Sequence, residues 1–142
     1  MNSVYDAITG SITNDSINAG SGNDTINASA GNDTLSGGLG NDSVSADDGN
    51  DQLYGGSGDD TLDGGAGDDL IIGHKGNDSI LPGDGDDNVR YRLADGNDTV
   101  KDSLGLDTVD INGNGAGNVF TLGQLGDQLQ VTALGQTVTV DS

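Results

Sequence analysis

The chain has 142 residues, of which 26 are glycine, 31% are hydrophobic and 3% are aromatic, and its formal net charge is −20. Such a chain cannot bury enough apolar surface to offset the entropy lost on folding, so we expect disorder unless the carboxylates are neutralised. The charge argues against a nucleic-acid partner. The absence of cysteine excludes disulfides, and the longest apolar run, Leu70 to Ile72, is too short to span a membrane.

Residues 1–12 form a short lead-in at the N-terminal edge. The start, MNSVYDAITGSITND, has neither a basic region nor an apolar stretch of the kind found in cleaved signal peptides. We therefore expect no cleavable leader here. The segment contributes at most a partial repeat.

Residues 13–110 contain a repeat with a period of nine residues. Its anchor is an aspartate that recurs at Asp15, Asp24, Asp33, Asp42, Asp51, Asp60, Asp69, Asp78 and Asp87. A glycine stands two residues before each anchor except the first, and an aliphatic residue stands two residues after every one. All 24 acidic residues are aspartate, whose short side chain suits tight turns. Because the aspartate, the glycine and the aliphatic residue keep the same spacing in successive units, the pattern indicates a repeat architecture rather than low-complexity sequence.

The spacing lengthens after Asp87. The next anchors are Asp98, which lies eleven residues further on, and Asp107. The two extra residues fall within Val89 to Leu93, where apolar and basic residues alternate, and this pattern predicts a lengthened strand. Residues 90–92 are interpreted as the exposed face of that strand, with a binding patch as the alternative.

Residues 111–142 lack the aspartate repeat. Alternating apolar and polar residues predict strands near Val119 to Leu122, Gln128 to Ala133 and Thr137 to Val140. Turns are expected at Gly126–Asp127 and at Gly135–Gln136. We interpret this segment as an antiparallel β cap.

Each repeat unit joins a glycine-rich turn to a short strand, as in GGSGDDTLD from Gly55 onward. Two units make a coil of eighteen residues, and stacked coils lie about 4.8 Å apart with the aliphatic row inside. Stacking places the anchors in two columns, one with Asp15, Asp33, Asp51, Asp69 and Asp87 and the other with Asp24, Asp42, Asp60 and Asp78. Carboxylates at this spacing repel one another unless a cation lies between them.

The cation that suits such columns is calcium. One histidine and no thiolate disfavour zinc and copper, whereas Ca²⁺ accepts about six to eight oxygen ligands in flexible geometry. Folding and calcium binding should then be a single event. Anchors two units apart form four pairs in one column and three in the other, which predicts about seven sites, and Asp98 and Asp107 could raise the number to nine.

The units GGLGNDSVS, GGSGDDTLD and GGAGDDLII resemble the nonapeptide of the haemolysin-type calcium-binding repeats, also called RTX repeats. The resemblance covers roughly residues 13–110. It implies an all-β fold, a right-handed parallel β-roll solenoid in which two nonapeptide units make one turn. It also implies that the anchors, Asp98 and Asp107 included, are calcium ligands and that the C-terminal antiparallel β cap covers the open end of the roll.

The resemblance also implies how the protein is exported and where it folds. Proteins of this family typically leave Gram-negative bacteria by type I secretion and fold outside the cell, where calcium is abundant. The chain is therefore expected to be an extracellular structural module of a larger exported protein, and no nucleophile–base constellation points to an enzyme.

Two alternative functions stay open. One is the non-catalytic C-terminal module of a secreted hydrolase, and the other is an ice- or surface-binding solenoid of the adhesin type. A column of hydroxyl residues supports the second: Thr25, Ser43, Thr61 and Ser79. The neighbouring column is irregular and weighs against it: Asn27, Ser45, Asp63 and Leu81.

Overall fold

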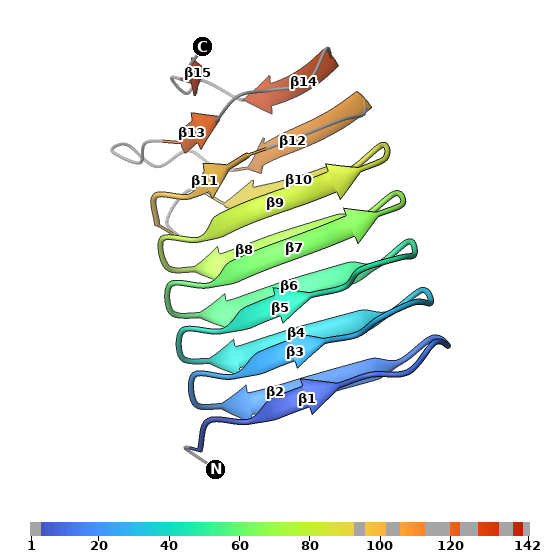
Figure 1. The fold of residues 1–142 in the computed structure, drawn as a ribbon. Helices are drawn as coiled ribbons and strands as arrows, with labels where there is room; N and C mark the ends of the chain where they lie inside the picture. Colours follow the sequence, from blue (N-terminus) through green and yellow to red (C-terminus); the bar gives the residue numbers. More distant parts are fainter. Residues whose placement is uncertain are drawn as a thin grey trace.

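A computed structural model describes residues 4–92, 96–101, 106–112, 120–122, 128–133 and 138–140. These residues form fifteen strands and no helix, so the described part of the chain contains no helix that could cross a membrane. The strands belong to two sheets, and the chain passes from one sheet to the other with every strand (Figure 1).

The odd-numbered strands form the first sheet, in the order β1 (Ala7–Thr9), β3 (Thr25–Asn27), β5 (Ser43–Ser45), β7 (Thr61–Ala66), β9 (Ser79–Asp84), β11 (Thr99–Val100), β13 (Phe120–Leu122) and β15 (Val138–Val140). The even-numbered strands form the second, in the order β2 (Ser16–Ser21), β4 (Thr34–Leu39), β6 (Gln52–Ser57), β8 (Leu70–Lys75), β10 (Asn88–Arg92), β12 (Leu106–Asn112) and β14 (Gln128–Ala133).

Neighbouring strands pair in parallel from β1 to β9 and from β2 to β10, and each paired residue lies beside its counterpart two repeat units further along the chain. Leu35 of β4, for example, lies beside Ile17 of β2 and Leu53 of β6. Backbone hydrogen bonds continue around the turns, as from the Gly58 N–H to the Lys75 carbonyl at 2.8 Å. The predicted all-β parallel solenoid is confirmed.

The core is the aliphatic row that the repeat predicts. Its members are at most 1% exposed: Ile26, Leu35, Val44, Leu53, Leu62, Ile71, Ile80, Val89, Val100 and Val109. Tyr91 is also buried, so its assignment to an exposed face is wrong. Alternation along β10 turns Tyr91 inward together with Val89, and its hydroxyl donates a hydrogen bond to the Gly96 carbonyl.

The coils lengthen where the aspartate spacing lengthens. Ser79 pairs with Thr99, and Asn88 pairs with Thr108, so each of these coils is two residues longer than a regular one. The following coils, in which Thr99 pairs with Thr121 and Thr108 pairs with Gln130, are longer again by two residues. The strands of this region still pair in parallel, although β9 pairs with β11, and β8 with β10, at only two positions.

The antiparallel pairing predicted for the C-terminal segment is wrong for its described strands. β13, β14 and β15 extend the two sheets in parallel, and the pairing of Phe120 with Val138 returns to the spacing of the regular coils. Alternating apolar and polar residues identify a strand but do not set its direction. The two predicted hairpin turns lie outside the described residues, and the expected boundary at residue 111 falls inside β12.

Candidate metal centre

The anchor aspartates line the two edges of the roll, where the chain turns from one sheet to the other. Oδ1 of an anchor accepts a hydrogen bond from the backbone N–H of the aspartate one coil earlier, at 2.7–2.9 Å. The donors are Asp6, Asp15, Asp24, Asp33, Asp42, Asp51, Asp60, Asp69 and Asp78. One carboxylate oxygen of each anchor from Asp24 to Asp98 therefore ties its coil to the preceding coil.

The other carboxylate oxygen lies in a buried position. The anchors from Asp24 to Asp87, and Asp98, are only 1–3% exposed. Within the described part of the chain, no hydrogen-bond donor reaches Oδ2 of Asp24, Asp33, Asp42, Asp51, Asp60 or Asp69. Burying a charged carboxylate whose oxygen has no hydrogen-bond donor costs several kcal/mol of folding free energy, unless a proton or a cation neutralises the charge.

The electrostatics of the columns favour neutralisation. Burial raises the pKa of Asp60 to about 7; the hydrogen bond from the Asp42 N–H lowers it, and the neighbouring carboxylates raise it. The same causes raise the pKa of Asp69 to about 7. Burial also raises the pKa of Asp42 and of Asp51. Near neutral pH, binding of a proton or a cation therefore stabilises the central carboxylates of both columns.

A glycine five residues before the aspartate leaves room for the second oxygen. A Cβ added to Gly55 would stand 2.5 Å from Asp60 Oδ2 and 2.7 Å from the Gly73 carbonyl oxygen of the next coil. A Cβ added to Gly64 would meet the equivalent two oxygens at 2.3 Å. Neither glycine has a positive φ, so the backbone itself would accept alanine. A side chain at Gly55 or Gly64 would therefore displace oxygens that converge there from two coils.

The residue four positions before the aspartate has a positive φ in eight successive units, from Gly20 to Gly83. Three of these residues are not glycine: Ser29, Asp47 and His74, with φ of 81°, 73° and 69°. Each such residue adds strain of about 1 kcal/mol or more. His74 keeps the turn conformation, and its ring stacks on that of Tyr54. The turn therefore survives where its sequence departs from the repeat.

A second ladder of hydrogen bonds runs beside the anchors, and the sequence did not predict it. The side-chain oxygen of the residue before each anchor from Asp15 to Asp78 accepts the backbone N–H of its counterpart one coil later, at 2.8–3.2 Å. The acceptors are Asn14, Asn23, Asn32, Asn41, Asn50, Asp59, Asp68 and Asn77. The Asn–Asp pair thus links each coil in both directions.

The residue five positions before the anchor is glycine in only some units of each edge. Gly37, Gly55 and Gly73 share one edge with Ala19, and Gly10 and Gly64 share the other with Ala28, Ala46 and Pro82. The methyl groups of Ala28 and Ala46, which mark the alanine turns, are fully buried. Because a Cβ at this position competes with the carboxylate and carbonyl oxygens, the alanine turns offer a cation less room.

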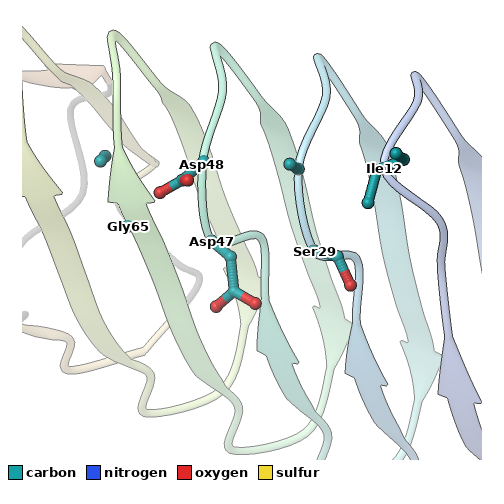
Figure 2. A pocket seen from close by; sticks show the side chains of 7 residues that line it. Ile12, Ser29, Asp47, Asp48 and Gly65 are labelled. Atoms are coloured by element: carbon teal, nitrogen blue, oxygen red, sulfur yellow. The ribbon is translucent and has the colours of Figure 1, made fainter.

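The outer surface of the alanine turns carries a hollow of about 510 Å³. Figure 2 shows Asp47 and Asp48 on one turn, with Ser29 and Ile12 on the turns before it. The Asp47 carboxylate accepts hydrogen bonds from Asn27 Nδ2 at 3.1 Å and from Ser45 Oγ at 2.9 Å. Local hydrogen bonds therefore hold Asp47 on the outer surface, apart from the buried anchor column.

The ends of the columns differ from their middle. Asp15 is half-buried, and its Oδ2 accepts hydrogen bonds from the N–H and the hydroxyl of Ser11. Asp98 is buried and accepts the Asp78 N–H. Asp107 lies in β12, but its side chain is outside the described residues. Asp6 belongs to the column of Asp24, because its N–H donates a hydrogen bond to Asp24 Oδ1. The sequence contains the information to predict this, since Asp6 stands nine residues before Asp15.

The donor set of each edge consists of oxygen atoms. Among the described residues, no group of three or more aspartate or histidine side chains gathers at one point, because each turn supplies one buried anchor. A cation here would take carboxylate oxygens together with backbone carbonyls of two successive turns. Such hard oxygen ligands in a flexible arrangement fit Ca²⁺ better than Zn²⁺ or Mg²⁺.

A scan against protein families matches the RTX calcium-binding nonapeptide repeat (4 copies) at residues 9–44, 27–62, 36–71 and 54–89. The matched windows overlap and together run from residue 9 to residue 89, which is more than half of the chain. A search of curated proteins finds no matching sequence.

Proposed function

This chain belongs to the RTX calcium-binding nonapeptide repeat family, and we propose that it is a structural module that folds when Ca²⁺ binds between its turns. RTX repeats bind Ca²⁺. The observation that carries the proposal is the row of buried Oδ2 atoms, six of which have no hydrogen-bond donor within the described residues. Calcium would neutralise these carboxylates without disturbing the Oδ1 hydrogen bonds between coils.

The side-chain ligands that we propose are the anchors: Asp15, Asp24, Asp33, Asp42, Asp51, Asp60, Asp69, Asp78, Asp87, Asp98 and Asp107. Backbone carbonyls of the glycine turns, such as that of Gly73 beside Asp60 Oδ2, would complete each site. Pairs of anchors give about seven sites in the regular part of the roll, and the last two anchors would raise the number to at most nine.

The module is proposed to act outside the cell as part of a larger protein exported by type I secretion. An acidic chain without calcium stays unfolded, which suits passage through a secretion channel, and calcium outside the cell then folds it. We assign calcium binding to residues 13–110 of a right-handed roll, with residues 1–12 as its N-terminal edge. Residues 111–142 would cover its C-terminal end, because repeat folds need a cap.

The decisive experiment is a calcium titration followed by far-ultraviolet circular dichroism. In EDTA at neutral pH the chain is expected to be disordered, and at about 1 mM Ca²⁺ it is expected to show a β-sheet spectrum. Calorimetry under the same conditions counts the ions bound. A spectrum that is the same in EDTA and in calcium would refute the proposal.

Gly55→Ala tests the oxygen cradle, by which we mean Asp60 Oδ2 and the Gly73 carbonyl oxygen beside Gly55. Since the new Cβ would stand 2.5 Å from Asp60 Oδ2, the carboxylate must move. We expect the calcium concentration at the folding midpoint to rise about tenfold, a loss of about 1.4 kcal/mol. The control is Ser57→Ala two residues further on, whose side chain is partly exposed and is not among the atoms nearest to the new Cβ. Equal midpoints for the two variants would show that the cradle does not bind calcium.

The structure does not favour the ice- or surface-binding alternative. Thr25, Ser43, Thr61 and Ser79 do align in one column of the first sheet. The adjacent column, however, holds Asn27, Ser45, Asp63 and Leu81 in register, so the face lacks a second uniform row.

A further inference from the structure

The second sheet separates locally between β8 and β10. β6 and β8 pair over five positions, whereas β8 and β10 pair only at Leu70–Asn88 and Ile71–Val89. From Arg90 onward β10 stays paired with β12, over all five of its residues. The separation begins where the lengthened coil departs from the regular repeat, and it leaves a slot between two strands of one sheet.

The slot is a cavity of about 190 Å³. Its lining residues are Ile72, His74, Arg90, Tyr91, Arg92 and Asp110. Because Tyr91 points into the core, the strand alternation turns both arginine side chains outward. On the β8 side, the His74 ring stacks on Tyr54 with centroids 6.2 Å apart and planes inclined by 25°. The slot thus combines cationic groups with an apolar and aromatic wall.

This concentration of positive charge is unusual for the molecule. The chain has four lysines and arginines against 24 aspartates, and three of the four lie in β8 and β10: Lys75, Arg90 and Arg92. Neither guanidinium forms an ion pair within the described part of the chain. Arg90 and Arg92 both line this cavity, and a pair of guanidinium groups can supply the planar, multidentate donors that oxyanions prefer.

We propose that the slot between β8 and β10 binds an oxyanion, the carboxylate or sulfate group of a small ligand or of a saccharide. Arg90 and Arg92 would donate hydrogen bonds to the anionic group, and Ile72 and His74 would contact the body of the ligand. Asp110 lies beside Arg90 in the register of β12 and β10, and its carboxylate would compete with the ligand for the guanidinium. This function goes beyond calcium binding and needs only the folded roll, in which every bound Ca²⁺ removes two negative charges.

The test uses the whole chain saturated with calcium, with sodium sulfate and sodium glucuronate as separate probes at constant ionic strength. Backbone and arginine side-chain N–H signals are followed by nuclear magnetic resonance. Saturable shifts are expected for residues 72–74 and 90–92. The double variant Arg90→Gln/Arg92→Gln should weaken binding at least about tenfold, and Asp110→Asn should strengthen it about threefold. Saturation by one probe alone would support the proposal and identify the anionic group.

The matched control is Lys75→Gln/Lys101→Gln, which removes the same total charge from residues that do not line the slot. It should change the affinity less than about twofold, because exposed charges are screened by salt. Circular dichroism and the calcium midpoint confirm that each variant folds. Three results would overturn the proposal: no saturable shift with either probe, equal weakening by the lysine control, or shifts confined to another part of the roll.

Discussion

Asp60→Asn is expected to remove two calcium ions from the roll. Asparagine can still accept the hydrogen bond that Asp60 Oδ1 takes from the Asp42 N–H at 2.8 Å, so the link between coils persists. The buried negative charge is lost. Because Asp60 lies between Asp42 and Asp78 in its column, the proposed sites on both sides of it lose a ligand.

The measurement is calcium stoichiometry by calorimetry together with the folding midpoint by circular dichroism. Relative to about seven ions for the unchanged chain, the variant should bind two fewer. Its midpoint should rise at least about tenfold, or about 1.4 kcal/mol. A loss of one ion or none would contradict the shared column.

Asp59→Asn is the matched control for this variant. It removes the same charge from the adjacent residue, which is exposed and belongs to the second ladder. Asparagine occupies this position in most other units, and its side-chain oxygen would still accept the Asn77 N–H. The control should bind as many ions as the unchanged chain, so a difference between the two variants isolates the role of the anchor.

Much of the roll could be predicted from periodicity alone. A residue that recurs in every unit returns to the same edge in every second unit, so the aspartate columns and the buried row from Ile26 to Val109 follow from counting. Asp6 satisfies the same rule, since Ile8 stands two residues after it, yet the missing turn glycine conceals the unit.

Other features depend on contacts between coils and leave no periodic trace of their own. The spacing reveals an asparagine before the anchor but not that its oxygen accepts an N–H from the following coil. Similarly, a glycine such as Gly55 suggests a turn, while its actual requirement is space for two oxygens. Strand direction in the tail was mispredicted for the same reason, because Phe120 and Val138 pair through a register that only the preceding strands impose.

The raised pKa of Asp60 and of Asp69 makes the metal-free roll sensitive to pH. Both values are about 7 in the folded chain, against an ordinary value of 3.8. The folded state therefore binds protons more tightly than the unfolded state, so protonation stabilises the metal-free roll. This stabilisation is complete below about pH 4 and disappears as the pH rises through about 7. At high pH each ionised carboxylate destabilises the roll by at most about 4 kcal/mol, and by less where solvent screens the charge. Two such groups are comparable with the total stability of an ordinary domain, about 5–15 kcal/mol.

In EDTA, lowering the pH from about 8 to about 5.5 is thus expected to increase β-structure, because protons replace calcium as the neutralising charge. Calcium must displace those protons from the folded, metal-free roll, so the calcium midpoint should rise as the pH falls, and calcium binding at about pH 5.5 should release protons. At about pH 8 the metal-free chain is unfolded and its carboxylates are already ionised, so calcium-driven folding should release none. Circular dichroism at each pH measures the first effect. Calorimetry in two buffers of different ionisation enthalpy measures the second. A sodium chloride series at fixed pH separates general screening from protonation. If the midpoint were the same at about pH 6 and about pH 8, protons and calcium would not be competing for the same buried carboxylates.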